Sequence, residues 1–359
     1  MKKLLTLLLS LTLVVSMLTA CGKSDDGKKD PTVAPTKKAE TTTAPTNAPT
    51  TEGAAKTGLA VITSLEKSAN PGDADGLAQV DSTVVAVLVG ADGKIISCKI
   101  DASQAKINFS KEGKLVTDLK TTFKSKQELG TEYGMTKASK IGKEWNEQAN
   151  AFASYVEGKT VEEVKGIALK EGVPSDADLA SSVTIHVSDY IAAIEKAVAN
   201  AQDLGAKSTD KLGLSVTTDL GQSKDASADA EGLAQAYSFY SAVTTADGKI
   251  TSCYIDASQG SVNFDTKGTI TTDLKVAPQT KQELKEAYGM KKVSKIGKEW
   301  NEQANAFAAY ATGKTADEVK GIAISKEGLA SDADLVSSVT VHVSPFITIV
   351  EKAAVNSAK

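Results

Sequence analysis

The chain contains one sequence twice, and this duplication constrains its fold more than any other feature. Residues 139–153 read SKIGKEWNEQANAFA, and residues 294–308 repeat all fifteen at an offset of 155. One inserted residue raises the offset to 156 near the end. The repeats run from about 58–202 and 213–359, joined by a short polar linker at 203–212. Each repeat is long enough to be a whole domain rather than a solenoid unit, so we expect two similar tandem domains.

Strand signals come first in each repeat. Residues 83–89 form a β-branched apolar run, and 94–100 follow a turn at Asp92-Gly93, which predicts a hairpin. A second hairpin is expected from 105–109 and 114–119. Its turn would be Lys111-Glu112-Gly113.

Helix signals follow the strands, so each repeat reads as α+β. Capping boxes starting at Ser125, Thr160 and Thr280 predict short helices. In the segment shared by both repeats, apolar residues from Trp145 onward recur at helical spacing and predict an amphipathic helix. The last helix of each repeat is expected to start with a serine cap, Ser188 or Ser344, and the second has Pro345 in its first turn.

The first 21 residues have the pattern of a targeting segment. Two lysines precede a mostly apolar stretch at 4–15, which is shorter than the roughly 20 residues of a membrane span. Leu18-Thr19-Ala20-Cys21 then resembles the lipobox of bacterial lipoproteins, in which the cysteine is acylated and the chain is cut before it. We therefore expect a lipid anchor at Cys21 and a location on the outer face of the bacterial cell membrane, extending into the cell wall. The alternative is a secreted protein with a chance cysteine here.

Residues 22–57 are predicted to form a disordered tether. The segment is rich in Thr, Lys and Ala and contains four of the eight prolines. Without apolar periodicity it cannot bury enough surface to offset the entropy of ordering. Such a segment would hold folded domains away from the membrane.

The composition excludes several function classes. All 41 basic residues are lysine against 45 acidic residues, so the chain lacks both arginine forks and the basic excess typical of nucleic-acid binding. Two histidines and three cysteines are too few for a zinc or haem site, and we expect no metal. A hydrolase is disfavoured because no base is paired with a nucleophile at recognisable spacing. Redox chemistry would therefore require an organic cofactor.

A short motif precedes the last helix of each repeat. It reads Asp178-Leu179-Ala180-Ser181-Ser182-Val183-Thr184 in the first repeat and Asp334-Leu335-Val336-Ser337-Ser338-Val339-Thr340 in the second. Its spacing resembles the flavinylation motif of the FMN-binding domain family, an acidic residue and two variable residues followed by Ser-Gly-Ala-Thr. In that family a flavin transferase uses FAD to join FMN to the threonine hydroxyl through a phosphoester.

The resemblance assigns a role to each motif position. The acidic position is matched by Asp178 and Asp334, the serine by Ser181 and Ser337, and the attachment threonine by Thr184 and Thr340. Ser182 and Ser338 replace the family's glycine, and each is followed by valine in place of alanine. Serine restricts the backbone more than glycine does.

With its lipobox, Thr-rich tether and tandem repeats, the chain resembles the lipoproteins of flavin-based extracellular electron transfer. The resemblance implies two covalent FMN groups per chain, a membrane quinone-linked dehydrogenase as electron donor, and acceptors such as ferric iron or free flavins. We expect an electron carrier rather than a stand-alone enzyme. The alternative is a non-redox surface lipoprotein that acts as an adhesin or ligand-binding module.

Two further pairs of residues each have two interpretations. His186 and His342 lie two residues beyond the threonines and could bond a flavin phosphate, or could be polar residues whose rings find backbone partners. Trp145 and Trp300 could stack on the isoalloxazine ring, although their helical spacing favours the core.

The remaining candidates also come in pairs. Tyr133-Gly134-Met135 and Tyr288-Gly289-Met290 are alternative walls for a flavin. Cys98 and Cys253 occur once per repeat within predicted strands, so we expect buried thiols rather than a disulfide.

Overall fold

The computed structural model describes residues 53–359 of the 359-residue chain. The predicted targeting segment with Cys21, and residues 22–52 of the predicted tether, lie outside the described residues. The described residues belong to one compact unit, which contains both repeats. In the described part of the chain, no helix has the length and apolar character needed to cross a membrane.

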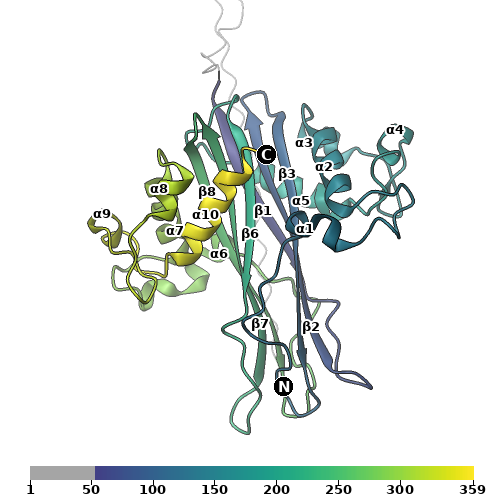
Figure 1. The fold of residues 1–359 in the computed structure, drawn as a ribbon, viewed down its shortest axis with the longest axis vertical. Coiled ribbons are helices and arrows are strands. Elements are labelled where there is room, and N and C mark those ends of the chain that lie inside the picture. Colours follow the sequence, from purple (N-terminus) through teal and green to yellow (C-terminus); the bar gives the residue numbers. More distant parts are fainter. Residues whose placement is uncertain (1–52) are drawn as a thin grey trace, which may run out of the picture. The chain divides into compact units, whose positions relative to one another are not determined.

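The first repeat is built on a three-stranded antiparallel sheet in the order β1-β2-β3 (Figure 1). Its strands are β1 (Ala55–Ser64), β2 (Gly76–Gly90) and β3 (Ile95–Phe109), followed by a small hairpin of β4 (Leu169–Lys170) and β5 (Val173–Pro174). Its helices are α1 (Lys126–Leu129), the 3₁₀ turn η1 (Gly130–Tyr133), α2 (Trp145–Val156), α3 (Val161–Lys165), α4 (Ala177–Ala180) and α5 (Ser188–Ala199).

The second repeat folds in the same order, again on an antiparallel sheet, β6-β7-β8. Its strands are β6 (Lys211–Asp219), β7 (Gly232–Ala246) and β8 (Lys249–Phe264). Its helices are α6 (Lys281–Leu284), the 3₁₀ turns η2 (Lys285–Tyr288) and η3 (Met290–Lys292), α7 (Trp300–Ala311), α8 (Ala316–Lys320), α9 (Ala333–Val336) and α10 (Ser344–Asn356).

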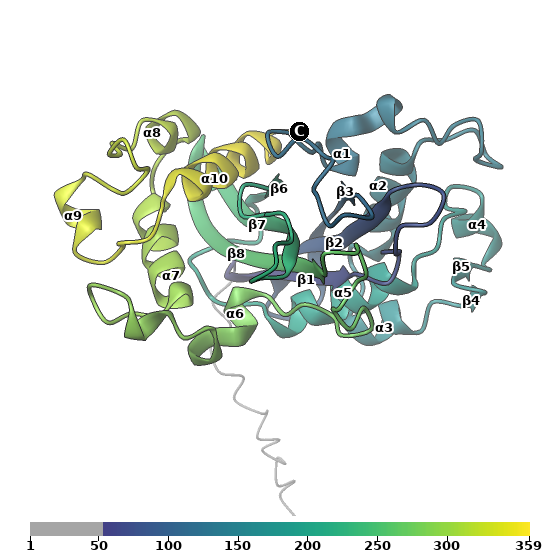
Figure 2. The same ribbon diagram turned by 90° about the horizontal axis from the view of Figure 1, so that it is seen from below.

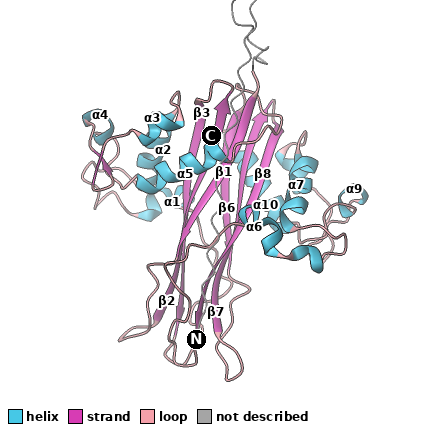
Figure 3. Ribbon diagram, turned by 180° about the vertical axis from the view of Figure 1, so that it is seen from behind, coloured by secondary structure: helices cyan, strands magenta, loops and turns pink. Residues whose placement is uncertain are grey.

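The two sheets pack against each other, and each carries its helices on the opposite face (Figures 2 and 3). Strand β2 shows why. Val84, Ala86 and Leu88 pack with residues of the second repeat's sheet, while Val85 and Val87 pack with the helices. Because successive side chains point to opposite faces, this continuous apolar run buries both faces of the strand.

Aromatic side chains fill the space between the sheets. Phe109 and Phe264 stack with ring centroids 4.3 Å apart and an interplanar angle of 5°, and both are fully buried. Tyr240 is also fully buried, and its hydroxyl is 2.8 Å from that of Ser258 and 3.2 Å from that of Ser82. The repeats therefore share one interior.

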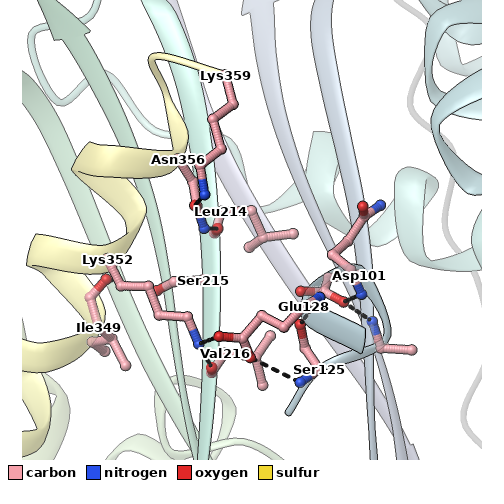
Figure 4. Close-up of polar contacts among 12 residues, drawn as sticks. Asp101, Ser125, Glu128, Leu214, Ser215, Val216, Ile349, Lys352, Asn356 and Lys359 are labelled. Carbon is pink, nitrogen blue, oxygen red and sulfur yellow. Dashed lines mark hydrogen bonds and ion pairs between the residues drawn. The ribbon is translucent and has the colours of Figure 1, made fainter. Parts of the chain in front are cut away.

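Two equivalent ion pairs link the repeats across the edges of the sheets. Lys352 of α10 lies 2.7 Å from Glu128 of α1 (Figure 4), and Lys196 of α5 lies 2.6 Å from Glu283 of α6. Each lysine also donates a 2.7 Å hydrogen bond to a backbone carbonyl of its own repeat's first strand. Since the partners occupy equivalent positions, the repeats contact each other as the copies in an isologous dimer do.

Reversing one of these charges is expected to weaken the contact between the repeats. Lys352→Glu would place two carboxylates together at a half-buried site, and we expect a loss of about 1 kcal/mol in the free energy of unfolding. Urea denaturation measures this, and adding Glu128→Lys should restore most of the loss. Lys320→Glu, in an ion pair within the second repeat, is the matched control. An equal effect of the two single variants would contradict a special role for the contact between repeats.

Several predicted elements are confirmed. The predicted hairpin lies within β2 and β3, and the shared segment forms the amphipathic helices α2 and α7. The capping boxes at Ser125, Thr160 and Thr280 are all formed. The last helices begin at the predicted residues.

Other predictions were wrong in detail. Residues 105–109 belong to the long strand β3 and the chain turns back at 110–114 as expected, but 114–119 pair with β3 only around Leu115 and Val116 and form no second strand. Val187 and Val343 hold the N-cap positions, which makes Ser188 and Ser344 the first helical residues instead of caps.

The predicted boundaries of tether and linker also shift. Strand β1 begins at Ala55, inside the predicted tether, and residues 54–57 pair with Gln202 and with residues 206–207 of the predicted linker. Ala206 and Leu212 are buried in the cluster between the sheets. The polar composition of the linker therefore concealed two residues that pack in the interior.

Candidate functional site

A cavity of about 580 Å³ lies in the second repeat. Its size is within the range usual for small-molecule sites, which are mostly lined by apolar and aromatic side chains. The lining is drawn from β6, β7, the turns η2 and η3, the start of α7, residues 340–342 and the start of α10. Its large apolar walls are Tyr237, Phe239, Tyr288, Met290 and Trp300.

The motif threonine of the second repeat lies on this cavity and is held by a buried glutamine. The backbone N–H and the hydroxyl of Thr340 donate to Gln303 Oε1 at 2.8 and 3.2 Å. The amide nitrogen of Gln303 donates in turn to Ser294 Oγ at 3.2 Å and to the Lys298 carbonyl at 3.1 Å. These bonds fix the orientation of the amide, so the position of the Thr340 hydroxyl is set by α7.

The first repeat holds its motif threonine in the same way. Thr184 donates through its N–H and hydroxyl to Gln148 Oε1, at 2.8 and 3.1 Å. Both glutamines lie in the fifteen-residue segment that the repeats share. Among the cavities described within residues 53–359, the two others, of about 390 and 380 Å³, are not lined by Thr184.

The other motif residues serve the short helices α4 and α9. The hydroxyls of Ser181 and Ser182 donate to carbonyls of α4 at 2.7 and 3.2 Å, and Ser337 and Ser338 do the same at α9, at 3.2 and 3.1 Å. Asp178 and Asp334 are exposed. In each motif the threonine is therefore bonded to the long helix α2 or α7, while the serines bond only to backbone carbonyls of the short helix before them.

A buried lysine, which the sequence analysis missed, lies among the aromatic walls. Lys281 is only 3% exposed, and its Nζ donates to the hydroxyls of Tyr237 and, at 2.7 Å, Tyr288. The amine is 4.4, 4.2 and 5.1 Å from the ring centroids of Tyr237, Tyr288 and Trp300. Burial lowers the pKa of Lys281 to about 7, although the carboxylate of Asp256 opposes the shift. The cavity therefore contains an amine that changes charge near neutral pH.

Buried carboxyls lie beneath each site. Asp256 Oδ1 accepts from the backbone of Ala257 at 2.8 Å and of Gln282 at 3.0 Å, and burial raises its pKa to about 7. Asp101 holds the equivalent place in the first repeat, and burial raises its pKa to about 6.

The candidate histidines and tryptophans have different positions in the two repeats. His342 is exposed and lines the cavity, while His186 is exposed beside Gly172. Trp300 is 2% exposed and packs in the core, as its helical spacing predicts, and it also lines the cavity. Trp145 is a core residue whose indole donates to Tyr190 at 2.9 Å.

The remaining pairs behave similarly. Tyr288 and Met290 line the cavity, whereas Tyr133 and Met135 pack against the helical core of the first repeat. In the described residues, Cys98 and Cys253 are buried free thiols, as predicted, and burial raises the pKa of both. The same residues contain no group of three or more His, Cys, Asp or Glu placed to hold a metal ion.

Lys281, Tyr237, Phe239 and Gln303 are the site residues that sequence reasoning missed. A comparison of the two repeats signals two of them. Gly-Leu-Ala-Gln at 76–79 recurs at 232–235, a local offset of 156, so Tyr237 and Phe239 stand where the first repeat has Asp81 and Thr83. No protein-family model matches the chain, and comparison with curated proteins and with solved structures finds no match.

Proposed function

We propose that the chain is a membrane-anchored flavoprotein electron carrier of the cell surface, with FMN joined to Thr340 and, through the matching motif, to Thr184 by threonine phosphoesters. The observation that supports this most is the cavity of about 580 Å³, which brings Thr340 together with Trp300, Tyr288 and Met290. Thr340 matches the attachment threonine of the motif that the sequence resembles, and the other three were considered as flavin walls from the sequence.

The residues of the second repeat fit such a group. A planar aromatic ring would lie among the apolar walls, and Thr340 presents its hydroxyl at the same cavity. His342 and Lys295 also line it and would provide donors for a phosphate. A bound flavin supplies reversible electron transfer, which the side chains here do not.

The protein's own residues would orient and shield the group. Gln303 fixes the threonine hydroxyl, because its carbonyl accepts both bonds from Thr340. Phe239 and Trp300, each at most 6% exposed, would exclude water from one end of the cavity. Lys281 would provide a titratable charge within this apolar environment.

The remaining parts of the proposal concern the setting of the protein. A lipid anchor at Cys21 would hold it on the outer face of the cell membrane. A flavin transferase would load it from FAD, a quinone-linked dehydrogenase would reduce it, and ferric iron or free flavins would reoxidise it. These partners follow from the resemblance of the motif and of the chain's organisation.

Intact mass spectrometry tests the proposal. Residues 22–359, co-expressed with a flavin transferase from the same source, are expected to gain two FMN phosphoester increments. Thr340→Val and Thr184→Val should each remove one increment, because each deletes one attachment hydroxyl at nearly constant volume. Peptide mapping would locate the added mass.

The bare polypeptide mass, with the transferase active on a control domain, would contradict covalent attachment. A colourless, unmodified protein would instead favour the adhesin or ligand-binding module.

A further inference from the structure

The two repeats differ at the strand positions that line the cavity. In β7, Tyr237 and Phe239 are two residues apart and lie on the same face of the strand, with ring centroids 4.3 Å apart. Both line the cavity, and Tyr237 accepts from the buried amine of Lys281. Gln222, a neutral residue from the loop after β6, also lines it.

The corresponding residues of the first repeat are charged or polar. Strand β2 has Asp81 and Thr83 at these positions, and Lys67 replaces the neutral glutamine. Lys67 Nζ lies 2.7 Å from Asp81 Oδ2, and two glutamine amides also donate to this carboxylate at 2.9–3.0 Å. Asp81 raises the pKa of Lys67, and Tyr133 and Asp189 lie near enough to add to this effect. The Lys67 side chain is 67% exposed, so the first repeat has a hydrated ion pair where the second repeat has Gln222 and Tyr237.

Lys281 and its counterpart in the first repeat, Lys126, have different surroundings for the same reason. Lys281 lies over three rings of the second repeat, including that of Tyr237. Its counterpart Lys126 is half-buried and lies over two rings, those of Tyr133 at 4.7 Å and Trp145 at 5.3 Å. A carboxylate at position 81 in place of an aromatic ring removes one wall and introduces a charge that must stay hydrated or paired.

We propose that the second repeat alone encloses a planar aromatic ring of the flavin class, because the Lys67–Asp81 ion pair stands in the first repeat where the second has the aromatic wall Tyr237. The inference rests on the proposed function for the class of ligand, but it does not require covalent attachment. Flavins attached at Thr340 and Thr184 would then have different surroundings, one enclosed and the other not.

Binding of riboflavin tests this, because riboflavin has no phosphate and cannot be attached through a phosphoester. Calorimetry on residues 22–359, produced without a transferase, is expected to give one site per chain. Exchanging two residues of the second repeat for those of the first, Gln222→Lys with Tyr237→Asp, should weaken binding at least tenfold. The reciprocal exchange, Lys67→Gln with Asp81→Tyr, should add a second site.

A second measurement needs no redesigned site. The chain has two tryptophans, one per repeat, so Trp145→Phe and Trp300→Phe assign their indole N–H signals in a nitrogen-15 NMR spectrum. Riboflavin is expected to shift the Trp300 signal and leave that of Trp145 unchanged. Two sites in the unmodified chain, no site, or equal shifts of both signals would overturn the inference.

The outcomes remain separable from those of the mass experiment. Riboflavin binding to the second repeat without any added mass at Thr340 would support this inference and contradict covalent attachment. Mass added at both threonines without riboflavin binding would support covalent attachment and contradict this inference.

Discussion

Phe264→Ala is expected to lower the free energy of unfolding by about 3–5 kcal/mol, a large share of the 5–15 kcal/mol typical of folded proteins. The ring is fully buried between the sheets and stacks on Phe109. Gly232 packs its backbone directly against the ring and has no side chain that could fill the space left by the substitution. Guanidinium denaturation followed by circular dichroism measures the loss.

The stacked pair supplies its own control. Phe109→Ala with Phe264→Ala should cost less than the sum of the single variants, because each single change already removes the shared contact. Val276→Ala, at a side chain 63% exposed, should change stability by less than about 0.5 kcal/mol. A loss below 1 kcal/mol for Phe264→Ala would show that the sheets do not depend on this contact.

The second large effect is a pH dependence of stability with opposite slopes on the two sides of neutrality. The pKa of Asp256 is about 7 in the folded chain, whereas an unfolded aspartate has about 4. The folded state therefore holds this proton more tightly. Its contribution to stability is complete below pH 4 and is lost as the pH rises to 7, by about 4 kcal/mol at 1.36 kcal/mol per pKa unit.

Lys281 acts in the opposite sense. Its folded pKa of about 7 lies below the unfolded value of about 10.4, so the folded state disfavours the charged amine. This penalty is fully present below pH 7 and disappears as the pH rises from 7 to 10. The combined contribution of Asp256 and Lys281 to the free energy of unfolding is therefore lowest near neutral pH.

Two variants separate these slopes. Asp256→Asn keeps an oxygen to accept the backbone bonds, and should raise the melting temperature relative to the unmodified chain above pH 7 but not at pH 4. Lys281→Met should raise it at pH 6 and lose this advantage by pH 10. Thermal unfolding at constant ionic strength, from pH 4 to 10, measures both differences. A difference that does not vary with pH would contradict the assignment for that residue.

Local chemistry made part of the fold predictable. A capping box needs only two residues three positions apart, and the spacing of Trp145 and Phe152 within the helix is equally local, so both could be predicted from the sequence. The extent of β2 was not, because its run from Val84 to Leu88 is apolar on both faces and gives no alternation. Only the packing of a second sheet against it explains that pattern.

The site divides in the same way. Thr340, Trp300 and Tyr288 could be proposed because they occur in recognisable segments. Lys281 could not, because it occupies the first turn of a short capped helix, where a lysine is usually solvated. Its burial depends on Tyr237, which reaches it from a strand 44 residues earlier in the chain. The contact between Lys281 and Tyr237 therefore emerges only once the strand is placed beside the helix, although the difference between the repeats at position 237 can be read from the sequence.

The packing of the two sheets against each other determines how the stability of the folded unit depends on protein concentration. Two separate chains joined through the same surface would obey mass action and dissociate on dilution. Here a covalent connection keeps the partners at a fixed effective concentration, however few molecules are present. The melting temperature of this unit should therefore be independent of protein concentration, and a single copy at a surface keeps its interior intact.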